Sequence, residues 1–309
     1  MAAKFIIAID LGGTNLKTAV LDLKYKIIGK RVLSTRQFRN KEDLILAIAR
    51  SVDMFTEGGK LRKNDILGIG LGLPGPIDEK SGIVHFFPNI PGWKEVKLKK
   101  ILERKLGLPV FLDNDAKLMA LAEYRLGRAQ GFKNALCLTL GTGVGGGIII
   151  GGSLYRGSDN AAGEIGHVPV NIEGPRCNCG GAACLEAYIG NNNILKEAKK
   201  IFKRNISLEE LSALARKQNK LALGIWSKVA KHLGTALAGV VNLLNLDAIV
   251  IGGGVAGAGP VLFNKVKETL KARAMSVQAR RVKLFKAKLG NEAGLIGAAI
   301  MVKQEMACA

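Results

Sequence analysis

The chain has 309 residues, a length at the upper limit for one hydrophobic core, so two lobes are expected. Hydrophobic residues make up 48 % and charged residues 23 % of it, which excludes disordered, collagen-like and coiled-coil chains. The net charge is +21 and 39 residues are glycine. Such a charge suggests nucleic-acid binding, and a glycine excess suggests phosphate-binding turns.

The sequence carries no signal for export or membrane insertion. The first apolar run, Phe5–Ile9, has five residues and is too short for the core of a signal peptide. The longest uncharged stretch, Asn134–Tyr155, contains seven glycines, which favour broken strands over a membrane helix. Five cysteines, three of them within eight residues, argue against a disulfide framework. We therefore expect a cytoplasmic protein that does not bind membranes.

The N-terminal third predicts α/β structure that begins with a hairpin. Two β-rich runs, Phe5–Ile9 and Thr18–Leu21, flank a glycine turn, which is typical of paired antiparallel strands. Apolar periodicity and turn residues then predict a helix, two strands and a second helix, in the order Lys41–Phe55, Ile66–Leu73, Val110–Leu112 and Ala116–Leu126.

The strand–turn–strand pattern recurs later in the chain, where Ala135–Leu140 runs into glycines 141–147 and out through Ile148–Ile150. This repetition predicts two related α/β lobes, each presenting one glycine turn. The segment 158–186 is irregular, and the elements expected after it are a helix capped at Ser207, a long helix Leu221–Leu246, a strand Ala248–Ile251 and a helix Pro260–Ala272. The expected lobes are 1–112, completed by a helix at 293–309, and 113–292.

Three glycine turns follow predicted strands, where backbone N–H groups can approach a phosphate closely because no Cβ is present. They are 12–14, 141–147 and 252–254. Two of them match G-x-G-x-x-G, but the run at 141 leads into a strand, and the run at 252 lacks the acidic residue that a dinucleotide site requires. No P-loop motif is present. Each turn alone could be ordinary tight-turn geometry, and the three together favour phosphates.

His167, Cys177, Cys179 and Cys184 have the spacing H-x9-C-x-C-x4-C. Three thiolates and one imidazole satisfy tetrahedral Zn²⁺ and leave no position for water, so the pattern predicts a structural zinc. The alternatives are buried, unligated thiols or a redox pair.

Several carboxylates stand where side chains reach a cleft. Asp115 lies between a predicted strand and helix, and Asp113, Asn114 and Asp115 cannot all be helix caps, so at least one is left for substrate. Glu164 and Glu186 flank the predicted zinc ligands, in a loop that could accept several hydroxyl donors from a sugar.

Seven segments, in order, resemble the motifs of the ROK (repressor, open reading frame, kinase) family, and its bacterial glucokinase branch in particular. The resemblance covers essentially the whole chain. The segments are Asp10–Asn15, Leu73–Asp78, Pro88–Trp93, Asp113–Ala116, Leu140–Gly147, Ala162–His167 and Cys177–Glu186.

This resemblance implies a two-lobed actin-like, ribonuclease-H-like α/β fold, with an interlobe cleft for sugar and ATP·Mg²⁺. It implies that Asp115 is the general base for a sugar 6-hydroxyl and that His167 binds both zinc and sugar. The other implied sugar-binding residues are Gly75, Asn89, Asn114, Glu164 and Glu186. The implied nucleotide-binding residues are Asp10, Gly12, Gly13, Thr14, Asn15, Gly141, Thr142, Gly143, Gly252, Gly253 and Gly254.

One departure from the family pattern is Ala183, where glycine is commoner, and it is expected to be harmless if its φ is negative. Family members that are repressors carry a helix-turn-helix segment before the first glycine turn. Asp10 is preceded by nine residues, so we expect no nucleic-acid partner. Glucose is the expected sugar, with N-acetylmannosamine, N-acetylglucosamine, fructose and allose as alternatives, and a homodimer or homotetramer is expected.

Overall fold

The structure, a computed structural model, describes residues 3–35, 38–57, 61–87, 90 and 92–308. It divides into two compact units. Unit 1 comprises Met1–Ala122, Arg156–Ala162 and Asn291–Ala309, and unit 2 comprises Glu123–Tyr155 and Gly163–Gly290. The sequence places the first division after residue 112. In the structure it falls after residue 122, inside helix α3 (Asp115–Leu126).

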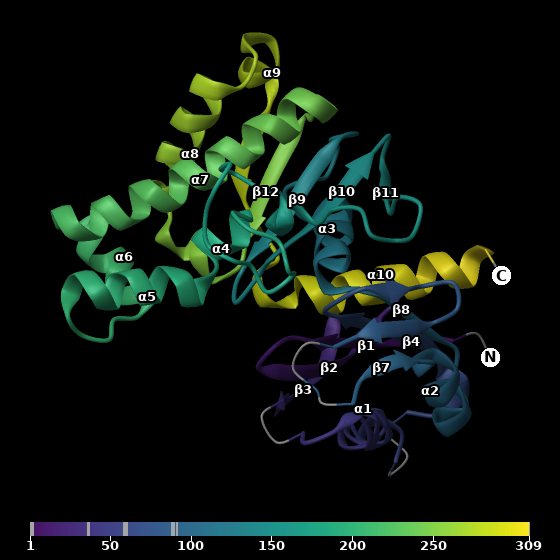
Figure 1. Cartoon of the computed structure of the whole chain (residues 1–309). Helices are drawn as coiled ribbons and strands as arrows, with labels where there is room; N and C mark the ends of the chain where they lie inside the picture. Colours follow the sequence, from purple (N-terminus) through teal and green to yellow (C-terminus); the bar gives the residue numbers. More distant parts are fainter. Residues whose placement is uncertain (1–2, 36–37, 58–60, 88–89, 91, 309) are drawn as a thin grey trace. The chain divides into compact units, whose positions relative to one another are not determined.

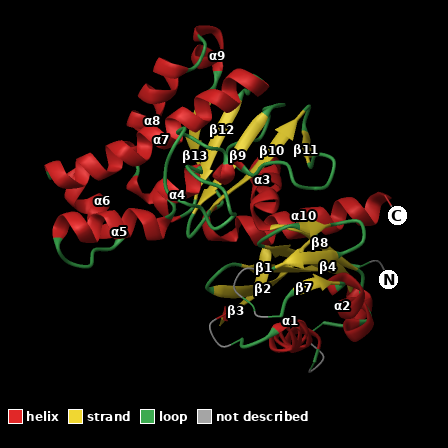
Figure 2. Cartoon of the chain, in the orientation of Figure 1, coloured by secondary structure: helices red, strands yellow, loops and turns green. Residues whose placement is uncertain are grey.

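Unit 1 is built on a five-stranded sheet with the order β3-β2-β1-β4-β8 (Figures 1 and 2). The hairpin expected at the N-terminus is confirmed, since β1 and β2 are antiparallel, while β1, β4 and β8 run parallel. The strands are β1 (Phe5–Leu11), β2 (Asn15–Asp22), β3 (Ile27–Ser34), β4 (Ile66–Leu73) and β8 (Val110–Asn114). A small second sheet consists of β5 (Ile77–Asp78), β6 (Ile83–Phe86) and β7 (Lys94–Val96).

Helices cover this sheet and bury β1 and β4 almost completely. They are α1 (Lys41–Thr56), α2 (Leu98–Leu106) and α10 (Ala293–Cys308). A 3-10 turn, η2 (Lys63–Asp65), precedes β4, and another, η5 (Gly290–Glu292), spans the boundary between the units. Helix α10 lies directly against β4, because a Cβ on Gly70 would come within 2.4 Å of the Ala298 carbonyl oxygen. The C-terminal helix expected at 293–309 therefore lies in unit 1.

Unit 2 repeats the same sheet, with the order β11-β10-β9-β12-β13 and the same pattern of antiparallel and parallel pairs. This repetition confirms that the two lobes are related. The strands are β9 (Ala135–Leu140), β10 (Val144–Ile150), β11 (Ser153–Tyr155), β12 (Ala248–Gly252) and β13 (Lys283–Lys286).

Helices form the rest of the unit 2 core, in which Trp226 is completely buried. They are α4 (Leu185–Ile189), α5 (Asn191–Phe202), α6 (Leu208–Arg216), α7 (Lys220–Leu244), α8 (Pro260–Arg273) and α9 (Ser276–Arg281), with 3-10 turns η3 (Ile165–His167) and η4 (Gly254–Ala258). The cap expected at Ser207 is confirmed, because its hydroxyl accepts a hydrogen bond of 3.1 Å from the Glu210 amide.

Two sequence predictions about boundaries are wrong. Glycines 145–147 belong to strand β10, because they pair with β9, so the turn itself is limited to 141–143. The strand expected at Val110–Leu112 extends to Asn114, and helix α3 begins at Asp115, one residue before the expected start.

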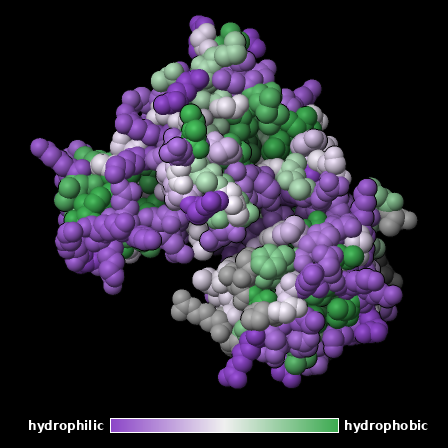
Figure 3. Space-filling model, viewed as in Figure 1, coloured by the Kyte–Doolittle hydropathy of each residue, from purple (hydrophilic) through white to green (hydrophobic). Residues whose placement is uncertain are grey.

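The excess of positive charge lies at the surface. Hydrophilic side chains gather over α5 and α6 (Figure 3), where Lys196, Lys199 and Lys200 are exposed. The basic stretch of α8 is also solvated, as its exposed Lys267 and Lys271 show. In the part of the chain that the structure describes, no helix is long and apolar enough to cross a bilayer.

Candidate active site

The carboxyl ends of three parallel strands bring the predicted residues of unit 1 to one edge of its sheet. Asp10 of β1 is in register with Gly72 of β4, and Gly72 is in register with Asp113 of β8. Polar groups at this edge of a parallel sheet are placed where such folds bind ligands. The Asp10 carboxylate is nearly buried and forms an ion pair of 2.8 Å with Lys17 Nζ.

The first glycine turn closes through a hydrogen bond of 2.9 Å from the Gly12 amide to the Asn15 carbonyl oxygen. Gly12 has no left-handed φ, and a Cβ there would have ordinary clearance, 3.8 Å from that oxygen. Within the described part of the chain, therefore, neither backbone conformation nor packing requires glycine at position 12. Close approach of a ligand does provide a reason for it. Gly13 and Thr14 are exposed.

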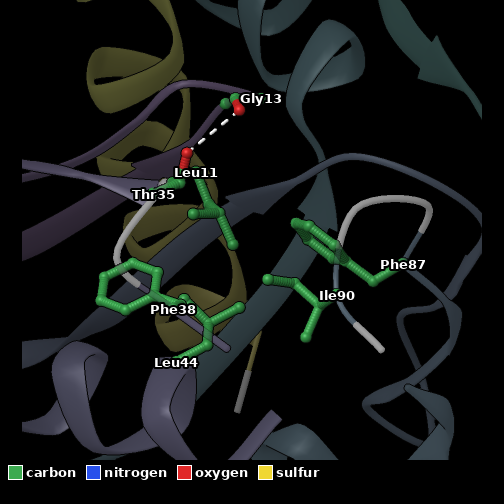
Figure 4. A pocket seen from close by; sticks show the side chains of 8 residues that line it. Leu11, Gly13, Thr35, Phe38, Leu44, Phe87 and Ile90 are labelled. Atoms are coloured by element: carbon green, nitrogen blue, oxygen red, sulfur yellow. Dashed lines mark hydrogen bonds between the residues drawn. The ribbon is translucent and has the colours of Figure 1, made fainter. Parts of the chain in front are cut away.

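A cavity of about 300 Å³ adjoins this turn (Figure 4). The Thr35 hydroxyl donates a 3.0 Å hydrogen bond to the Gly13 carbonyl oxygen and so fixes the turn from one side. The residues that line it are Leu11, Gly12, Gly13, Thr35, Phe38, Leu44, Phe87 and Ile90. Phe87 and Ile90 flank Asn89, a predicted sugar-binding residue that lies outside the described residues.

Asp115 is the first residue of α3 and is half-buried. The N-terminal cap of this helix is Asn114, whose Oδ1 accepts hydrogen bonds from the amides of Ala116 (3.0 Å) and Lys117 (3.3 Å). Asn114 Nδ2 lies 3.4 Å from the Gly75 carbonyl oxygen, so two predicted sugar-binding residues are in contact. Asp115 Oδ1 accepts a 2.8 Å bond from the Ala116 amide.

A buried ionic cluster supports this segment. Asp113 is completely buried and accepts a 2.9 Å ion pair from Arg156, which also pairs with Glu79. Lys117 is buried too, and its Nζ donates to the carbonyl and to the side-chain oxygen of Asn160. Burial raises the pKa of the Glu79 carboxyl, and the attraction of Arg156 opposes this effect. No sequence motif marks the other members of this cluster, because they come from segments far apart in the chain: Glu79, Lys117, Arg156 and Asn160.

In unit 2 the second and third glycine turns lie next to each other at the carboxyl ends of β9 and β12. Gly253 has φ +85°, and a Cβ there would lie 2.3 Å from the Leu140 carbonyl oxygen, so the fold itself requires this glycine. Gly141 differs, because a Cβ there would have no described atom within 4 Å. Gly252 is buried at the end of β12, Gly254 begins η4, and Thr142 is exposed.

The elements that carry the predicted sugar-binding residues of unit 2 contact the start of β10. The Val144 amide donates a 2.8 Å hydrogen bond to Glu186 Oε2, and a Cβ on Gly166 would lie 2.2 Å from the Val144 carbonyl oxygen. Gly166 belongs to η3, which also contains His167 and directly follows Glu164. Helix α4, which carries Glu186, and η3 therefore both contact the start of β10.

The four predicted zinc ligands are brought together. Their ligand atoms all lie within 4.8 Å of one another. Cys177 Sγ is 3.7 Å from His167 Nδ1, and Cys179 Sγ is 3.7 Å from Cys184 Sγ. A tetrahedron with Zn–S bonds of about 2.3 Å has S···S edges of about 3.8 Å, so the donor set fits Zn²⁺.

The loop around this cluster is held by backbone hydrogen bonds, including one of 2.9 Å from the Cys177 amide to the Gly181 carbonyl oxygen. The Gly181 amide lowers the pKa of the Cys179 thiol, whereas burial raises that of Cys184 to about 12 without a metal. Ala183 has a φ of +56°. The expectation that alanine is harmless at this position required a negative φ, so that condition is not met. A left-handed alanine costs about 1–2 kcal/mol, a cost that glycine would avoid.

Comparison with known proteins identifies relatives over the whole chain. The model of the ROK family matches residues 6–305. A glucokinase of Halalkalibacterium halodurans is 36 % identical, with 99 % of this chain and 97 % of the relative covered. The solved structure of a ROK family glucokinase from Streptomyces griseus, in complex with glucose and AMPPNP, has a TM-score of 0.84 at 32 % identity. It covers 97 % of this chain and 99 % of that one, and the likeness confirms the expected actin-like α/β fold.

Regulators are found among the relatives as well. A xylose repressor of Caldicellulosiruptor bescii is 30 % identical, with 97 % of this chain and 78 % of the repressor covered. The chain thus has relatives of two kinds, glucokinases and xylose repressors.

Proposed function

This chain belongs to the ROK family, and we propose that it transfers the γ-phosphoryl group of ATP to the 6-hydroxyl of glucose. The chain is an ATP-dependent sugar kinase, as its relatives named glucokinase indicate. The proposal of phosphoryl transfer to glucose rests on the two glycine turns, one in each unit. It rests also on Asp115, which lies at the same sheet edge as the glycine turn of unit 1. Among the residues that the structure describes, no packing contact requires glycine at positions 12 and 141, whereas close approach of nucleotide phosphates would require it.

Asp115 is the proposed general base. It lies at the start of α3, where Asn114 caps the helix, and is half-buried. Its carboxylate takes the proton of the sugar 6-hydroxyl as that oxygen attacks the γ-phosphorus and the β–γ bridging oxygen leaves with ADP. The Asp113–Arg156 ion pair fixes the strand end before it, which keeps the base in place.

The sugar is held by acceptors for its hydroxyl groups. Glu164 and Glu186 supply carboxylate oxygens, and His167 turns Nδ1 toward the cysteines, so Nε2 is the nitrogen proposed to contact the sugar. Gly75, Asn89 and Asn114 complete the proposed sugar-binding set. Carboxylates recognise hydroxyl donors through short, charge-assisted hydrogen bonds.

The nucleotide is held by the glycine turns, through the residues Gly12, Gly13, Thr14, Asn15, Gly141, Thr142, Gly143, Gly252, Gly253 and Gly254. Their amides and hydroxyls neutralise phosphate charge without blocking its approach. Mg²⁺, when bound, neutralises charge that develops on the phosphates, and Asp10 is the carboxylate proposed to lie near it.

A structural zinc on His167, Cys177, Cys179 and Cys184 is proposed to brace the loop that presents Glu164 and Glu186. Four protein ligands close the site, so this metal supplies rigidity and not chemistry. A cytoplasmic location and a homodimer or homotetramer stay predictions.

The base is tested by comparing Asp115→Asn with Asp159→Asn, a control at an exposed aspartate of unit 1. Loss of a general base lowers rates by about 10²–10⁴. We expect Asp115→Asn to lose kcat by a factor in this range, with unchanged circular dichroism, and Asp159→Asn to keep it. Turnover near the wild-type value in Asp115→Asn would exclude its role as base.

The substrate is tested by measuring kcat/KM for glucose, N-acetylmannosamine, N-acetylglucosamine, fructose and allose with ATP. We expect glucose to rank first. An N-acetylated sugar in first place would replace glucose in the proposal while leaving the kinase reaction intact.

A further inference from the structure

Glu186 has a structural partner that sugar binding does not explain. Its Oε2 accepts the 2.8 Å hydrogen bond from the amide of Val144, the first residue after the second glycine turn. The side chain is half-buried and projects from α4, which begins directly after Cys184. The same carboxylate that is proposed to contact the sugar therefore contacts the exit of the nucleotide turn.

The turn is held at both of its ends by the α4–α5 junction. The Asn191 amide donates a 2.9 Å hydrogen bond to the Gly141 carbonyl oxygen at the entrance, while Glu186 binds the exit. Asn193 Nδ2 donates a 3.1 Å hydrogen bond to the Glu186 carbonyl oxygen and so fixes the backbone of Glu186 against α5. The fit is close, because a Cβ on Gly143 would lie 2.5 Å from Glu186 Oε2.

We propose that Glu186 is a positioning residue for the nucleotide: it holds turn 141–143 in its phosphate-binding shape and thereby couples sugar binding to nucleotide binding. The inference rests on the proposed function, since it takes the turn as the phosphate site. A hydroxyl that donates to Glu186 fixes the orientation of the carboxylate. A fixed carboxylate fixes the Val144 amide, so bound sugar raises nucleotide affinity, and bound nucleotide raises sugar affinity by the same factor.

Two effects of the carboxylate oppose each other and can be separated. Its hydrogen bond organises the turn, whereas its negative charge repels the phosphates that the turn binds. Glu186→Gln keeps an oxygen that can accept from Val144 and removes the charge. Glu186→Ala removes both. If Glu186 positions the turn, Glu186→Gln should bind the nucleotide at least as tightly as wild type does. Glu186→Ala should bind the nucleotide more weakly than wild type.

The experiment measures the affinity of the full chain for AMP-PNP by calorimetry, with and without saturating glucose. Without glucose, we expect Glu186→Ala to bind AMP-PNP about tenfold more weakly than wild type, the factor that corresponds to one lost charge-assisted hydrogen bond. Glucose should tighten AMP-PNP binding in wild type and should have no effect in Glu186→Ala. The control is Glu173→Gln, an exposed glutamate in the same loop, which should match wild type.

A second substitution tests the contact from the turn. Gly143→Ala places a methyl group against Glu186 Oε2 and should weaken AMP-PNP binding in the wild-type background. In the Glu186→Ala background the same substitution should have little further effect, because the opposing oxygen is gone. Hydrogen exchange of the Val144 amide reports on the turn independently of any ligand and should be faster in Glu186→Ala than in Glu186→Gln.

Equal sugar-free affinities of wild type and Glu186→Ala for AMP-PNP would overturn the proposal, because a residue that only binds sugar leaves this value unchanged. Stronger binding by Glu186→Ala than by Glu186→Gln would also overturn it. If wild type bound no AMP-PNP at all, the proposed function would fail and the inference with it, whereas the other two results remove the inference alone.

Discussion

Glu123 of α3 allows a stability prediction to be worked from the structure. Its carboxylate is completely buried and accepts three backbone hydrogen bonds, each of 2.8 Å. Oε2 binds the Arg128 amide just after the helix, and Oε1 binds the amides of Lys288 and Leu289, more than 160 residues later. One side chain thus joins two distant segments of unit 2.

Replacement of Glu123 by alanine leaves three amides without their acceptor. An unsatisfied buried amide costs about 1–3 kcal/mol, and the lower end applies because Arg128 and Lys288 are exposed residues whose amides water can reach. We therefore expect Glu123→Ala to lower the free energy of unfolding of unit 2 by about 3 kcal/mol. That is a large fraction of the stability of a typical domain.

The assay is urea unfolding followed by tryptophan fluorescence in a Trp93→Phe background. Trp226, buried in unit 2, is then the only tryptophan of the chain and reports on that unit. Glu173→Ala serves as the control and should change the free energy of unfolding by less than about 0.5 kcal/mol. A loss below about 1 kcal/mol in Glu123→Ala would show that water replaces the carboxylate and would refute the reasoning.

Three further predictions concern a glycine, the metal and pH. Gly253→Ala should lower the melting temperature sharply, because its Cβ meets Leu140 at 2.3 Å, whereas Gly257→Ala, with no described atom within 4 Å, should not; equal melting temperatures would contradict this. Metal analysis should find about one zinc per chain. Removal of this zinc by a chelator should lower the melting temperature and raise the KM for sugar. A metal-free protein that stays folded and active would exclude a structural zinc. Because the pKa of Glu79 is raised, the folded state holds the proton of this carboxyl more tightly than the unfolded state does. The stability that this provides is present at low pH and is lost as pH rises above the ordinary glutamate value of about 4.5. The free energy of unfolding of Glu79→Gln should lack this pH dependence, and parallel plots of that free energy against pH for the variant and the wild type would contradict the prediction.

Much of the fold follows from local sequence pattern. The strand Ile66–Leu73 coincides with β4, and the hairpin around Asp10–Asn15 and its repeat in unit 2 are confirmed by the strand pairing. Alternating or continuous apolar runs bounded by glycine determine such elements within a few residues, so no distant contact is needed to predict them. The capping residue Ser207 was equally evident from its own neighbours.

Some parts of the candidate site can be predicted from the sequence and others cannot. The zinc cluster was predictable because its four ligands lie close in sequence and have few other uses in that pattern. The ionic cluster of Asp113, Arg156 and Glu79 was not, because a buried ion pair has no local signature. Ala183 shows the same limit, since its left-handed φ depends on how the loop closes around the metal ligands.

The sequence by itself determined the α/β class, the duplicated glycine hairpins and the family. Local periodicity and short motifs carry that information. Only the tertiary structure decided why particular residues occupy their positions: Gly70 because α10, more than 200 residues later, lies against it, and Gly143 because Glu186 does. Steric clearance and hydrogen-bond partners are properties of pairs of residues. When the two members are far apart in the chain, only folding brings them together.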